Sequence, residues 1–163
     1  MRDDPTTESI QELSGYLKGN AHAVKWVSDL FAVLHFFDDL VDRDQPMDDA
    51  RTIARLWQAV VDLPTNPFFL AHHQALAPAM ALAITNWDVA TRFERFGDEA
   101  DKRVAFVLRS SYADILELAC LIVGGREWAA EQALDIRRKF HAEGLDGYLA
   151  NLDKEAEARN GML

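Results

Sequence analysis

The chain has 163 residues, a formal net charge of −10, 49% hydrophobic residues and 27% charged residues. This length suffices for one domain with a hydrophobic core, and the composition is that of an ordinary soluble globular protein. The negative charge argues against direct nucleic-acid binding, which needs a basic surface. It permits a cation-dependent enzyme, or an acidic protein that binds a basic partner.

Three features bear on the compartment in which the protein works. Residues Met1–Pro5 are polar and acidic, so we expect no secretory signal. No uninterrupted run of about 18 apolar residues occurs, so we expect no membrane span. The single cysteine, Cys120, lies in an apolar segment and is predicted to be a buried small hydrophobic residue. Together these features predict a cytoplasmic protein.

Helical periodicity dominates the sequence, and no run alternates strictly between apolar and polar residues. Prolines and glycines fall at expected helix ends. The predicted helices span residues 6–18, 21–43, 47–62, 68–74, 78–96, 99–123, 127–142 and 145–158. The sequence therefore predicts an all-α protein, in which residues 1–163 form a single-domain bundle of about six to eight helices.

Two of these predicted helices carry pronounced apolar stripes. The helix over 99–123 is the most apolar in the chain, is predicted to be central, and should stop at Gly124-Gly125. The helix over 47–62 has an apolar side that consists of Ile53, Leu56, Trp57 and Val60.

The strongest functional signal is Asp38-Asp39-Leu40-Val41-Asp42, inside the helix predicted over 21–43. Position 38 continues an apolar stripe but holds an aspartate, and Asp42 projects from the same face, with Asp39 to the side. A carboxylate on an apolar stripe is costly unless it is paired or binds a cation. The pattern indicates a divalent-cation site, because hard cations prefer oxygen ligands. Alternatively, these aspartates lie at the solvated end of the helix, where Arg43 neutralises part of their charge.

A second candidate set of ligands lies in the helix predicted over 99–123. Asp114 and Glu117 are three residues apart and share a face. Helical bundles build metal sites from side chains on facing helices. Arg109, one turn before Asp114, is the expected cation for a phosphate group. In the alternative interpretation, Asp114 and Glu117 form ion pairs with an arginine, which is Arg103, Arg109 or Arg137.

A third set consists of Asn86 and Glu94. Their separation of eight residues returns them to one side of a helix after about two turns. The alternative is that Asn86 is a buried amide and Glu94 a surface charge.

The segment Phe37–Asp42 resembles the first aspartate-rich motif of class I isoprenoid synthases, the terpene and prenyl-diphosphate synthases. The resemblance implies an all-helical fold in which Asp38, Asp39 and Asp42 bind Mg²⁺ (or Mn²⁺) that holds a small-molecule diphosphate. The family's second motif, Asn/Asp-Asp-x-x-Ser/Thr-x-x-x-Glu, is matched only by Asn86 and Glu94. The chain is also shorter than such an enzyme, and its two motifs lie closer together.

Two other functions remain open. An all-α nucleotide pyrophosphohydrolase of the MazG-like or dimeric dUTPase-like group would use Asp38 and Asp42 with Asp114 and Glu117. In both enzyme interpretations the metal acts as an electrostatic clamp on a diphosphate. The third interpretation is a small acidic helical protein without catalysis, which binds or inhibits a protein partner; a homodimer is the further alternative.

Overall fold

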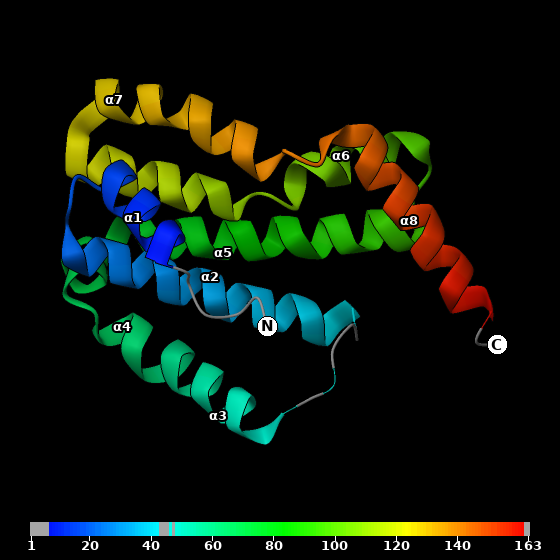
Figure 1. Cartoon of the computed structure of the whole chain (residues 1–163), viewed down its shortest axis with the longest axis horizontal. Coiled ribbons are helices and arrows are strands. Elements are labelled where there is room, and N and C mark those ends of the chain that lie inside the picture. Colours follow the sequence, from blue (N-terminus) through cyan, green and yellow to red (C-terminus); the bar gives the residue numbers. More distant parts are fainter. Residues whose placement is uncertain (1–6, 43–45, 47, 162–163) are drawn as a thin grey trace. The chain divides into compact units, whose positions relative to one another are not determined.

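The computed structural model in Figure 1 describes residues 7–42, 46 and 48–161. This part of the chain contains helices and no strand, which confirms the predicted all-α class. The elements are α1 (Thr7–Tyr16), α2 (Ala21–Asp42), α3 (Asp49–Trp57), the π-helix η1 (Gln58–Asp62), α4 (Leu63–Thr65), α5 (Pro67–Phe96), α6 (Glu99–Leu108), α7 (Tyr112–Phe140) and α8 (Gly144–Gly161).

Several helix ends follow from local chemistry. Lys18 and Gly19 adopt positive φ angles of 53° and 71° and end α1. The Asn20 side chain accepts a hydrogen bond from the Ala23 N–H at 3.0 Å and so caps α2. Asp48 caps α3 in the same way, by accepting from the N–H groups of Ala50 and Arg51.

The predicted division of the chain into helices is slightly off, because some expected breaks are absent and one unexpected break occurs. The segments 68–74 and 78–96 form the single helix α5, with Pro78 in its interior and a local kink at His72 (φ −127°, ψ 16°). The expected stop at Gly124-Gly125 is present as a break in α7, where Gly125 has φ 80° and ψ −179°.

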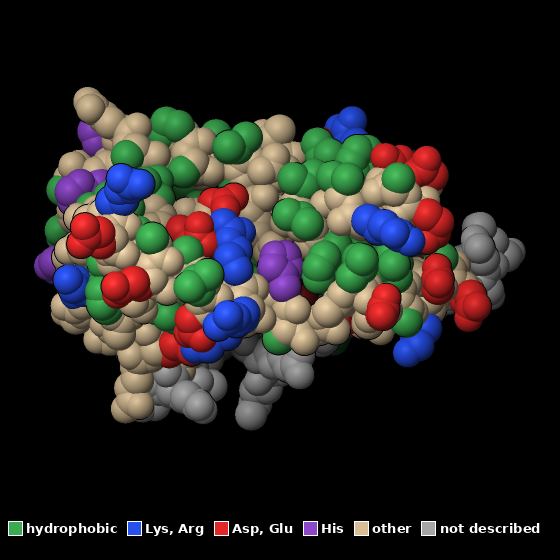
Figure 2. All heavy atoms as spheres, turned by 90° about the horizontal axis from the view of Figure 1, so that it is seen from above, with side chains coloured by type: hydrophobic (Ala, Val, Ile, Leu, Met, Phe, Trp, Pro, Cys, Tyr) green, Lys and Arg blue, Asp and Glu red, His purple; other side chains and the backbone are tan. Residues whose placement is uncertain are grey.

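The prediction of one central helix over 99–123 is wrong. The chain turns between α6 and α7, and Ser110 and Ser111 accommodate this turn with hydrogen bonds to the carbonyls of Val107 and Leu108. The valines Val104 and Val107 of the expected buried stripe are 47% and 57% exposed. Helix α6 instead packs through Ala105, Phe106 and Leu108. On the face drawn in Figure 2, hydrophobic side chains lie among charged ones.

The structure divides into two compact units. The first contains α1 to α4, α5 as far as Leu76, and Ala119–Arg126 of α7. The second contains Ala77–Leu118 and the described chain from Glu127 onward. That residues 1–163 form a single domain remains a prediction.

Each unit has its own core. In the first, Trp26 of α2 is fully buried and stacks on Phe69, with ring centroids 5.6 Å apart. In the second, Ala90, Ala105, Tyr148 and Leu152 form a buried cluster that joins α5, α6 and α8. Cys120 is buried, as predicted.

Candidate functional site

The aspartate-rich motif lies in the last two turns of α2. Asp38, Asp39 and Asp42 are all half-buried. The Asp39 carboxylate accepts a hydrogen bond from the Arg51 guanidinium of α3 at 2.8 Å, and this guanidinium also lies 5.3 Å from the ring centroid of Phe36. Asp38 and Asp42, one helical turn apart, project from a common side of α2. Arg43, the predicted neutralising residue, lies outside the described residues.

The position of these aspartates in the helix is electrostatically unfavourable. The C-terminal end of a helix carries a partial negative charge, and an acidic side chain there is destabilised by about 0.3–1 kcal/mol. The last turn of α2 contains no basic residue. The three aspartates therefore add negative charge to the negative end of the helix dipole, and Arg51 of α3 offsets part of it.

The second candidate set is engaged by an arginine. Arg137 of α7 forms ion pairs with both Asp114 and Glu117, and its Nε lies 2.5 Å from a Glu117 oxygen. Burial alone would lower the pKa of Arg137, but the hydrogen bonds to Glu117 and Asp114 outweigh it and raise that pKa. This arrangement is the ion-pair alternative that the sequence left open, with Arg137 as the arginine.

The third set is part of a buried polar cluster in the second unit. The Glu94 side chain is only 6% exposed, and it accepts a hydrogen bond from Arg109 at 2.5 Å and another from the Tyr148 hydroxyl. Burial, and then the bond to Glu94, raise the pKa of Tyr148 far above its usual value, so its hydroxyl remains a donor. The Asn86 amide donates to Ser111 Oγ at 3.0 Å. Arg109, predicted to bind phosphate, therefore compensates a buried carboxylate.

These contacts bear directly on metal binding. Among the described residues, no group of three or more His, Cys, Asp or Glu side chains is arranged to hold a metal ion. Two of the three predicted ligand sets have their charges compensated by arginines within the second unit. At the end of α2, in the first unit, Asp39 is likewise paired with an arginine, Arg51.

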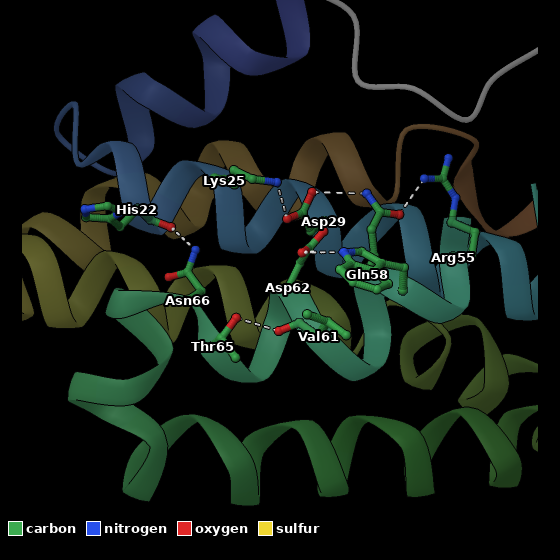
Figure 3. Close-up of polar contacts among 10 residues, drawn as sticks. His22, Lys25, Asp29, Arg55, Gln58, Val61, Asp62, Thr65 and Asn66 are labelled. Atoms are coloured by element: carbon green, nitrogen blue, oxygen red, sulfur yellow. Dashed lines mark hydrogen bonds and ion pairs between the residues drawn. The ribbon is translucent and has the colours of Figure 1, made fainter. Parts of the chain in front are cut away.

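Sequence reasoning missed a polar network between α2 and η1, which Figure 3 shows. The buried Asp29 accepts hydrogen bonds from Lys25 at 2.6 Å and from the Gln58 amide at 3.2 Å. The side-chain oxygen of Gln58, Oε1, in turn accepts a hydrogen bond at 2.5 Å from Arg55, which is 6% exposed. Gln58 begins the π-helix, where the Leu63 N–H bonds to the Gln58 carbonyl five residues back. Such π-helical turns are rare and frequent at functional sites.

A signal for Asp29 was present in the sequence. Asp29 lies three residues after Trp26 and four before Val33, both of which are buried, and so it interrupts an apolar stripe just as Asp38 does. Nothing in the sequence signals the π-helix that brings Gln58 to it.

A serine and a histidine lie close together in the second unit, but in a structural role. Ser110 Oγ and His141 Nε2 are 3.0 Å apart, and the Ser110 hydroxyl donates to the Val107 carbonyl at 2.9 Å. Burial, and then the charge of Arg137, lower the pKa of His141, so the ring is neutral near pH 7. A serine whose proton is directed away from the imidazole is not activated as a nucleophile.

The chain matches no family model, no curated protein and no solved structure. Helix α5 is long and apolar enough to cross a membrane by length and composition, which is weak evidence because core helices of soluble proteins meet the same criteria. The expected lack of a membrane span and the cytoplasmic location remain predictions.

Proposed function

We propose that the protein binds Mg²⁺ (or Mn²⁺) at the end of α2 and uses it to hold a diphosphate, as an enzyme resembling the class I isoprenoid synthases. The observation that carries the proposal is the location of Asp38, Asp39 and Asp42 in the last turns of α2, at the negative end of the helix. All three are half-buried, so a hydrated ion can approach them.

The donor set suits magnesium rather than a metal that needs an all-protein cage. Mg²⁺ is usually held by one or two carboxylates, with waters and substrate phosphates as the other ligands. Asp38 and Asp42 would supply the carboxylates. Arg51, 2.8 Å from Asp39, places a guanidinium beside them that suits a phosphate oxygen. Asp114, Glu117, Asn86 and Glu94 are not needed for this minimal site.

Bound there, the metal would stabilise negative charge on a diphosphate leaving group or activate a water molecule. The first reaction is that of an isoprenoid synthase, and the second that of a nucleotide pyrophosphohydrolase. Release of pyrophosphate from an allylic diphosphate, compared with hydrolysis of nucleoside triphosphates, distinguishes the two.

Binding itself is tested with Mg²⁺, Mn²⁺ and inorganic pyrophosphate. A ligand that binds only the folded state stabilises it by about 2.7 kcal/mol at a hundred times its dissociation constant, so the melting temperature should rise when metal and pyrophosphate are added together. The double variant Asp38→Asn/Asp42→Asn should lose this rise. Asp88→Asn is the matched control, because Asp88 is an exposed helical aspartate paired with Arg92. An equal rise in wild type and the double variant would contradict the proposal.

A further inference from the structure

The outward side of α3–η1 is apolar over its whole length. We call this surface the outer face; it consists of Ala50, Ile53, Ala54, Leu56, Trp57 and Val60, all exposed. Its four large side chains are 59–67% exposed. The apolar side predicted for this helix, with Ile53, Leu56, Trp57 and Val60, is therefore exposed. An exposed apolar face of this kind is typical of an interaction surface.

The orientation of this helix is fixed by its opposite side, which is polar. Arg51 binds Asp39 of α2, and Gln58 binds Asp29 of α2. Arg55, between them, is almost fully buried. Rotation that buried the outer face would break these bonds and leave buried charges uncompensated, at a cost of several kcal/mol. The contacts of the polar side with α2 therefore keep the outer face exposed in the first unit.

The charges that border the outer face are acidic. Asp48 and Asp49 are exposed at its N-terminal end, and the half-buried Asp62 lies near its C-terminal end. The two basic residues within 48–62, Arg51 and Arg55, lie on the polar side toward α2. The border is therefore negative at both ends, in a chain with a net charge of −10.

This border discriminates between occupants. A second copy in antiparallel register would place Asp48 and Asp49 beside Asp62 of its partner, and a parallel register would place each of these acids beside its own equivalent. Both arrangements oppose like charges. Helices that lie on membranes carry lysine and arginine beside the apolar face, and an acidic border is instead repelled by anionic lipids. A partner with basic side chains beside its apolar surface is attracted by the acidic border.

We propose that the outer face binds an amphipathic helix of another protein, whose apolar stripe is flanked by lysine or arginine. Trp57 is the expected anchor, because tryptophan dominates many interfaces and its Nε1–H is already satisfied by Asp62 at 3.1 Å. The apolar stripe of the partner covers Ile53, Leu56 and Val60, and its basic residues face Asp48, Asp49 and Asp62. The inference does not depend on metal binding at the end of α2.

The probe is a synthetic amphipathic peptide of leucine and lysine, about 18 residues long so that it can form a helix. A peptide with the same leucines and glutamate in place of lysine is its matched control. Isothermal titration calorimetry should show that the full-length protein binds the lysine peptide at least about tenfold more tightly than the glutamate peptide. Trp57→Ala should weaken binding of the lysine peptide by about tenfold or more.

Leu82→Ala provides the control variant, since Leu82 is equally exposed, at 60%, on α5 in the second unit. Its affinity for the lysine peptide should match that of wild type, and circular dichroism should show that both variants remain helical. Equal binding of the two peptides, equal losses in Trp57→Ala and Leu82→Ala, or no binding would overturn the proposal. Dimerisation in sedimentation equilibrium that Trp57→Ala abolishes, or binding to phosphatidylcholine vesicles, would assign the outer face to a second copy or to lipid instead.

Discussion

Helices α2 and α3–η1 contact each other, but α2 turns its apolar side inward and α3–η1 turns its polar side inward. Helix α2 buries its apolar side chains, including Trp26, Val27 and Leu30, and keeps Lys25 toward solvent. Helix α3–η1 turns Gln58 toward Asp29 of α2 (Figure 3) and buries Arg55. It exposes Leu56 and Trp57. An amphipathic pattern therefore identifies a helix without determining which side of it packs inward.

The difference arises from the polar side chains that α2 offers to its neighbour. Asp29 and Asp39 lie on the side of α2 that contacts α3 and η1, and they require donors. Gln58 and Arg51 supply those donors, so the polar side of α3–η1 must point inward. Buried carboxylates are tolerated only with such partners.

The largest expected effect comes from truncating one leucine on each helix. Leu30 of α2 is 3% exposed, whereas Leu56 of α3 is 59% exposed. Leu30→Ala should lower the free energy of unfolding by about 3 kcal/mol, through lost burial and the cavity left behind. Leu56→Ala should change it by less than about 0.5 kcal/mol, as is usual for a surface substitution. Urea unfolding measures both, and equal losses would show that the outer face is buried in solution.

Much of the fold could be predicted from the sequence. The all-α class and the beginnings of α2 and α6 follow from apolar spacing, from Gly19-Asn20 and from Gly97-Asp98. The turn at Ser110-Ser111 could not, because the apolar residues on its two sides continue one periodic pattern. The packing of Ala105 into the cluster with Tyr148 and Leu152 selects the other side of α6.

The candidate sites were predictable to a smaller degree. Asp38 and Asp29 interrupt apolar stripes in the same manner, and that pattern alone does not tell a cation ligand from a residue in a polar network. The partners of Glu94 are 15 and 54 residues away in sequence, at Arg109 and Tyr148. Contacts at such separations depend on the tertiary arrangement of helices, which periodicity does not encode.

An intermediate effect is expected from removing the carboxylate at the centre of the contact between α2 and η1. Asp29→Ala leaves the half-buried Gln58 amide without its acceptor, while Lys25, which is 63% exposed, can turn to water. The free energy of unfolding should fall by about 2 kcal/mol. Asp29→Asn, which retains one carbonyl oxygen, should lose less.

Asp88→Ala controls for the loss of an aspartate from a helix. Asp88 and Arg92 form an exposed i, i+4 pair, and such pairs contribute about 0.5 kcal/mol or less. If Asp29→Ala costs no more than Asp88→Ala in urea unfolding, the polar network does not fix the orientation of α3–η1.

The smallest effect is expected at Arg51, where α3 meets the end of α2. The Arg51 and Asp39 side chains are 20% and 31% exposed, so solvent screens their ion pair, and the guanidinium gains further from its position over the Phe36 ring. Arg51→Ala should therefore lower the free energy of unfolding by about 1 kcal/mol. Arg51→Lys keeps the charge without the planar group that stacks on the ring, and it should recover only part of this loss.

Because salt screens the ion pair and leaves the ring contact largely intact, the difference between wild type and Arg51→Ala should shrink at high ionic strength without vanishing. A difference that vanishes completely in salt would show that Arg51 stabilises the contact through charge alone. In that case its guanidinium is not held by the ring, and it could leave Asp39 for a phosphate group at little cost.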